Sequence, residues 1–151
     1  MLKNRVIILV SALLLICLTQ GMTAAQYAVV SESFSVSPGG TLTVDVEGAD
    51  IVISEAAGSV TVNVKGMKEE WSQWLDISQT ADGVLVKFDP EKRIRVRETI
   101  VFEIGVPTEF NIDAESSGGD ITVNTGIRGT VDVETAGGDT VSYTHLTLPT
   151  N

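Results

Sequence analysis

The chain contains very few of the residues that most often perform chemistry in proteins. Its 151 residues include one cysteine, Cys17, and one histidine, His145. A lone cysteine cannot close an intramolecular disulfide, and a lone histidine provides no pair of histidine ligands for a metal. The fold must therefore be held together by backbone pairing and an aliphatic core.

Motifs of the common enzyme classes are also missing. The chain has no Gly-x-Ser-x-Gly nucleophile elbow, no phosphate-binding glycine loop and no set of cysteine and histidine ligands. Acidic residues are plentiful, but the hydrolysis of glycosidic bonds needs one pair of carboxylates in a defined cleft. We therefore expect a protein that is not an enzyme, with no catalytic residues and no cofactor.

Positive charge is scarce as well. Ten lysines and arginines stand against twenty aspartates and glutamates, so the formal net charge is −10, and it becomes −12 when the two positive charges of residues 1–25 are removed. This charge opposes binding to nucleic acid and to anionic lipid. The basic cluster at residues 92–97 is expected to be a solvated hairpin. We expect no nucleic-acid partner and no direct lipid binding by the mature part.

Residues 1–25 have the order of a secretory signal peptide. Lys3 and Arg5 precede an apolar run, and polar and small residues follow up to Ala25. The run is short for a membrane span. We expect cleavage after Ala25 and export to the periplasm, the cell surface or the medium. An uncleaved anchor and a lipoprotein modified at Cys17 are the alternatives.

One short segment occurs twice, nineteen residues apart. Residues 112–120 read IDAESSGGD and residues 131–139 read VDVETAGGD, while a degenerate relative occupies residues 44–51. Each copy alternates apolar and acidic residues and then enters a turn. A fixed short period of this kind predicts stacked β-structure.

The rest of the chain also consists of short alternating segments separated by glycine-rich turns. A period of two places one set of side chains inside and the other in water. We expect an all-β domain over residues 26–139, built as a β-solenoid of short strands with Gly-Gly-Asp turns, with a β-sandwich as the alternative. Strands are expected at residues 42–47, 51–53, 60–64, 75–78, 84–88, 99–106, 110–114, 121–125 and 130–134, and a helical turn or loop at 66–74.

The last residues depart from the repeat. Thr140 stands where the preceding copy has Ile121, so we expect the strand pattern to break there. Residues 141–151 resemble translated sequencing-adapter sequence. We therefore expect residues 140–151 to be a non-native tail and the β-domain to be truncated at its C-terminal end.

The order of these features resembles a bacterial exported family known as the "putative adhesin" domain. The resemblance covers most of residues 34–139. It rests on a first strand region LTVDV, a strand IVFEIGVP ending at Pro107, and the successive turns SGGDITV and AGGD. It implies a β-solenoid of otherwise unknown function. The family has no established catalytic residues, so none are transferred to this chain.

Outward-facing acidic residues are the first candidates for a binding site. In-register stacking of the two copies would place Asp113 above Asp132 and Glu115 above Glu134, where like charges repel by about 0.8 kcal/mol in water. A calcium ion would offset this repulsion, because hard cations prefer oxygen ligands. The alternative is a metal-free, solvated face screened by salt. The same choice, with hydrogen bonds to turn amides as the alternative, applies to the turn residues Asp120 and Asp139.

Trp71 and Trp74 are the second candidates. Their rings, beside acidic and amide side chains, would form a platform for stacking on a sugar. The alternative is a structural role, because residues three apart on a helical turn share one face and would together cover the end of the core.

These features predict a noncatalytic, exported β-repeat domain of the cell envelope or the extracellular space that acts in adhesion or surface interaction. Its partner would be a cell-surface glycan or an envelope protein. Two other functions stay open. One is the N-terminal part of a secreted carbohydrate-active enzyme whose active residues lie beyond residue 139. The other is a scaffold or sensor domain of an envelope-stress system.

Overall fold

The computed structural model describes residues 27–91 and 99–144, whose regular structure consists of β-strands and one short 3-10 helix. The expectation of an all-β chain is confirmed. The strands are β1 Val30–Ser35, β2 Thr41–Val46, β3 Ala49–Glu55, β4 Ser59–Lys65, β5 Leu75–Gln79, β6 Gly83–Phe88, β7 Ile100–Val106, β8 Asn111–Ser116, β9 Ile121–Thr125, β10 Val131–Thr135 and β11 Thr140–Thr144, with a 3-10 helix η1 at Glu69–Trp74.

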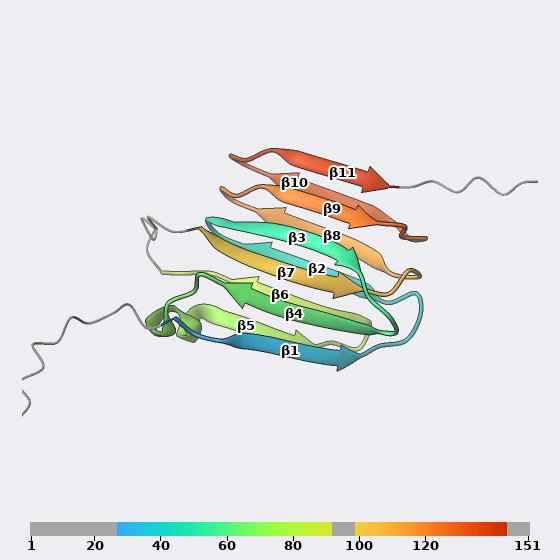
Figure 1. Cartoon of the computed structure of the whole chain (residues 1–151), viewed down its shortest axis with the longest axis horizontal. Coiled ribbons are helices and arrows are strands. Elements are labelled where there is room, and N and C mark those ends of the chain that lie inside the picture. The colour runs from blue at the N-terminus through green and yellow to red at the C-terminus, as the bar shows by residue number, and fades with distance from the viewer. Residues whose placement is uncertain (1–26, 92–98, 145–151) are drawn as a thin grey trace, which may run out of the picture.

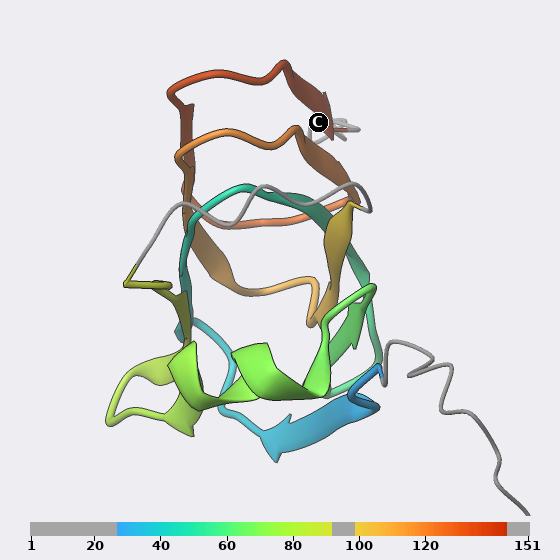
Figure 2. The ribbon, with the colours of Figure 1, turned by 90° about the vertical axis from the view of Figure 1, so that its left-hand side faces the viewer.

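The strands form two mixed sheets that enclose the core (Figure 1). The six-stranded sheet has the order β1-β4-β7-β3-β9-β11, and the five-stranded sheet has the order β10-β8-β2-β6-β5. Figure 2 shows the sheets nearly end-on, as the two side walls of a stack. Each wall therefore has one face toward the core and one face toward water.

Four pairs of consecutive strands cross from the five-stranded to the six-stranded sheet, and we call each pair a coil. Neighbouring coils pair in parallel in both sheets, in the spatial order β6–β7, β2–β3, β8–β9 and β10–β11. The first coil in the sequence thus lies between the second and the third. Antiparallel strands β1, β4 and β5 continue the two walls beyond β6–β7, and η1 connects β4 to β5 at that end.

The register of the repeat agrees with the nineteen-residue spacing read from the sequence. Val131 of β10 lies opposite Ile112 of β8, and Thr140 of β11 lies opposite Ile121 of β9. The degenerate copy joins the same stack, because Ile51 lies opposite Ile121 on its other side. Between this coil and the β8–β9 coil the chain runs through β4, η1, β5, β6 and β7, so the two coils are not nineteen residues apart.

The core is one continuous set of aliphatic and aromatic side chains between the walls. These residues alternate along each strand with exposed or half-buried ones, so a one-residue shift would turn the apolar set into water. The largest side chains that are fully buried include Phe88, Phe102, Phe110, Leu42, Ile51, Ile53 and Met67. Ser116 is the one buried polar residue in the described part of the chain.

The Gly-Gly turns allow the coils to approach each other. A Cβ atom on Gly119 would lie 1.9 Å from the carbonyl oxygen of Ala49 in the neighbouring coil, and one on Gly138 would lie 2.2 Å from that of Gly119. Only glycine fits at these two positions without moving the backbone. By contrast, a Cβ on Gly118 would meet no atom closer than 3.8 Å.

A polar ladder beside the glycines joins each coil to the next. The Ser116 hydroxyl donates to the Ala49 carbonyl at 2.9 Å and accepts the Gly119 amide at 3.0 Å. One coil further, the Thr135 hydroxyl donates to the Gly119 carbonyl at 2.9 Å and accepts the Gly138 amide at 3.2 Å. Serine and threonine occupy the same position because each supplies one donor and one acceptor.

The expected strands and the helical turn are confirmed, whereas β1 was not anticipated. The expected break at Thr140 is wrong for the backbone, because β11 begins there and pairs with β9. Whether residues 140–151 are foreign stays a prediction. The predicted signal peptide and the basic cluster at 92–97 lie outside the described residues, as does His145. None of the helical structure in the described ranges is long and apolar enough to span a membrane.

Replacing Gly119 with alanine should destabilise the protein by about 2–3 kcal/mol, because the new methyl group overlaps the backbone of the neighbouring coil. Gly118→Ala is the matched control and should stay within about 0.5 kcal/mol of the parent. Urea unfolding followed by circular dichroism measures both. Equal midpoints for the two variants would contradict the close approach of the coils.

Candidate functional site

The outer face of the five-stranded sheet carries the predicted carboxylates, and we call it the acidic face. Asp113 lies opposite Asp132, and Glu115 lies opposite both Glu134 and Asp45, so the predicted stacking of the two copies is confirmed. The four carboxylates of β8 and β10 are on exposed residues. The arrangement creates a strip of negative charge along the wall.

Lys87 reaches this strip at the end of the acidic face nearer to β5. Lys87 of β6 lies 3.4 Å from the carboxylate of Asp45 and 3.8 Å from that of Asp89. These surface ion pairs are half-exposed and contribute little to stability. Among residues 27–91 and 99–144, no group of three acidic, histidine or cysteine residues is placed to hold a metal ion. The expected metal-free face stays a prediction, with a calcium site as its alternative.

The turn aspartates form a second ladder, at the turns where β3, β9 and β11 of the six-stranded sheet begin. The Asp50 carboxylate accepts the backbone amide of Asp120 at 3.0 Å, and the Asp120 carboxylate accepts that of Asp139 at 2.8 Å. A carboxylate that accepts a hydrogen bond from a backbone amide in this way fixes the conformation of the turn. For Asp120 the structure therefore supports the role in the turn that was the alternative to metal binding.

The two tryptophans lie at the end of the stack where η1 covers the core. Trp71 is 7% exposed, and Trp74 is half-buried and packs against the same apolar cluster. The Lys68 ammonium group lies 4.9 Å from the centre of the Trp71 ring, where it contributes a cation–π contact. This placement matches the capping role. A sugar could stack on Trp71 only if η1 moved.

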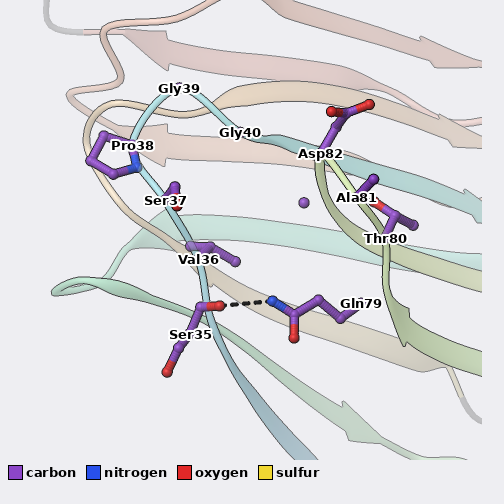
Figure 3. A pocket seen from close by; sticks show the side chains of 11 residues that line it. Ser35, Val36, Ser37, Pro38, Gly39, Gly40, Gln79, Thr80, Ala81 and Asp82 are labelled. Carbon is purple, nitrogen blue, oxygen red and sulfur yellow. Dashed lines mark hydrogen bonds between the residues drawn. The ribbon is translucent and has the colours of Figure 1, made fainter.

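A cavity of about 300 Å³ lies between the loop joining β1 to β2 and the turn joining β5 to β6 (Figure 3). The Gln79 amide bridges the two segments by donating to the Ser35 carbonyl at 2.8 Å. Asp82 is the one titratable side chain in its lining. Asp82 is therefore the one side chain in this lining that could exchange a proton with a ligand.

The outer face of the six-stranded sheet differs from the acidic face, and the sequence analysis missed it. Its central rows consist mainly of hydroxyl and amide side chains, and we call it the hydroxyl face. One row places Thr61 opposite Gly105 and Gly105 opposite Ser54; the next places Asn63 opposite Glu103. The signal was present in the alternation of β3 and β4, but only the register shows that these residues meet.

The hydroxyl face contains a hollow of about 330 Å³ around Gly105. A Cβ on this glycine would lie 2.6 Å from the Thr61 hydroxyl and 2.8 Å from the Ala56 methyl group. The missing side chain thus lets the turn after β3 fold down onto the sheet. Glu103, at the side of the hollow, is paired with Lys65, and Glu55 is the other acidic residue in the lining.

No family model and no curated protein match the chain. Its structure resembles a "putative adhesin" from Bacteroides fragilis at 11% identity and a TM-score of 0.46, covering 80% of this chain and 61% of that one. A "putative cell adhesion protein" from Clostridium sporogenes shows 12% identity and a TM-score of 0.47, with coverages of 74% and 59%. The chain thus spans less than two thirds of either protein, and similarity this distant establishes neither family nor activity.

Replacing Glu115 with glutamine should stabilise the protein by about 0.5–1 kcal/mol at low salt, because it removes repulsion from Asp45 and Glu134. The gain should shrink as salt screens the remaining charges. Glu32→Gln is the control, since Glu32 lies opposite Val62 and not opposite another carboxylate. Thermal melting at two salt concentrations tests this. A destabilised Glu115→Gln protein would show that the carboxylate has a favourable partner.

Proposed function

We propose that this chain is an exported, noncatalytic surface-interaction module that acts in adhesion, at the cell envelope or outside the cell. We further propose that its two walls are those of a β-solenoid. The parallel, in-register pairing of four successive coils in both walls supports this architecture over a β-sandwich. The export depends on the predicted signal peptide.

The observation that carries the function is the contrast between the interior and the outer faces. The interior is apolar, and its one buried polar residue in the described part, Ser116, is engaged in hydrogen bonds between coils. The polar side chains stand instead in rows on two long walls of different chemistry. Such an array favours binding over an extended surface, whereas catalysis needs a few groups converging in a shielded cleft.

The proposal includes a partner class and a metal-free state. A glycan or a protein of the cell surface would meet one of the walls, and the acidic charge disfavours nucleic acid and anionic lipid. At a spacing of about 4.8 Å between strands, two exposed carboxylates repel by less than about 1 kcal/mol in water, which the fold can tolerate without a cation. No calcium ion is therefore part of the proposed function.

An adhesion assay with the mature chain tests the proposal. Beads carrying residues 26–151 should be retained on bacterial cells or isolated cell envelopes well above beads carrying albumin at equal density. The same protein should release no reducing ends from a panel of envelope and plant polysaccharides. Retention equal to the albumin control would contradict adhesion, and release of reducing ends would contradict a noncatalytic role.

A further inference from the structure

Two hollows on the molecule adjoin each other at the turn after β3. The first is the hollow of about 330 Å³ on the hydroxyl face, and the second is a wider one of about 680 Å³ beside the β7–β8 connection. Glu55 and Ala56 line both. We call the two adjoining hollows together the Glu55 groove.

The half of the groove on the hydroxyl face offers polar groups that nothing else in the described chain uses. The side chains of Ser54 and Thr61 make no hydrogen bond to any other described residue, in contrast to Ser116 and Thr135 in the turns. A hydroxyl both donates and accepts. Ser54 is exposed and Thr61 is half-buried, so both hydroxyls are available to a ligand.

The other half of the groove is more apolar and has a fixed acceptor at its edge. Its lining includes Pro38, Ala57 and Pro107. The Thr108 hydroxyl donates to the Glu55 carboxylate at 2.6 Å, which holds that carboxylate between the two halves. A second oxygen of Glu55 remains able to accept from a ligand.

We propose that the Glu55 groove binds a neutral oligosaccharide, a proposal that rests on the adhesive function and names its ligand class. Sugar rings have apolar C–H faces, which suit the proline and alanine lining, and hydroxyls, which suit Ser54, Thr61 and the Glu55 carboxylate. This combination of apolar surface with a few positioned polar groups is typical of small-ligand sites.

Other ligand classes fit the groove less well. A peptide that adds a strand needs a free sheet edge, but β7 lies under the groove between β4 and β3, which both pair with it. An anionic polymer would meet the carboxylates of Glu55 and Glu109. A cationic partner would find more negative charge on the acidic face of the opposite wall.

Titration of the ¹⁵N-labelled mature chain with three neutral hexasaccharides tests the proposal: those of β-1,4-glucose, α-1,4-glucose and β-1,4-N-acetylglucosamine. At least one should shift the amide signals of Ser54, Thr61, Gly105 and Thr108 together. Glu55→Gln and the double variant Ser54→Ala/Thr61→Val should each raise the dissociation constant about tenfold, the loss expected for one or two hydrogen bonds.

The matched control is Thr43→Val/Ser78→Ala, the same pair of changes on the outer face of the other wall. It should leave the dissociation constant unchanged, and the amide spectrum of each variant checks that it is folded. Three results would overturn the proposal that the groove binds sugar. They are the absence of shifts with all three sugars, shifts that map elsewhere on the protein, and a control variant that binds as weakly as the groove variants. If the groove proposal fails but the beads still adhere to cells, the adhesive function stands with a different binding surface. If the sugars cause no shifts and the beads do not adhere, both the groove and the adhesive function are contradicted.

Discussion

The structure depends on the register between neighbouring coils. Because side chains alternate along a strand, a shift of one residue in any coil would move its aliphatic set to water and its carboxylates into the core. The parallel pairing of β8 with β10 keeps Ile112 beside Val131 and Asp113 beside Asp132. The same register that builds the core therefore also stacks like charges on the outside. The acidic face is a consequence of the repeat and needs no ligand to explain it.

The turns hold this register by contacts that tolerate little substitution. Gly119 and Gly138 let successive backbones touch, and the hydroxyls of Ser116 and Thr135 bond one coil to the next on the inner side of the same corners. These contacts are short-range and directional, whereas the packing of valines and isoleucines would also be satisfied by a shift of two residues. The turn motif thus specifies the alignment, and the aliphatic column stabilises it.

Much of this fold could be predicted from the sequence, because the repeat displays both its period and its turns. The same pattern predicted the pairing of Asp113 with Asp132. Sequence reasoning missed β1, whose short polar stretch around Ser31 and Ser33 lacks the apolar alternation of an inner strand. It also could not find the hydroxyl face, because Thr61, Gly105 and Ser54 are distant in sequence and meet only through the order β4-β7-β3.

The central claim is the in-register pairing of the coils, and scalar couplings across hydrogen bonds measure it directly. The account predicts couplings from the Ile51 amide to the Asp120 carbonyl, from the Ile112 amide to the Thr130 carbonyl, and from the Ile121 amide to the Asp139 carbonyl. Couplings displaced by one or more residues, or none between these strands in a folded protein, would contradict it.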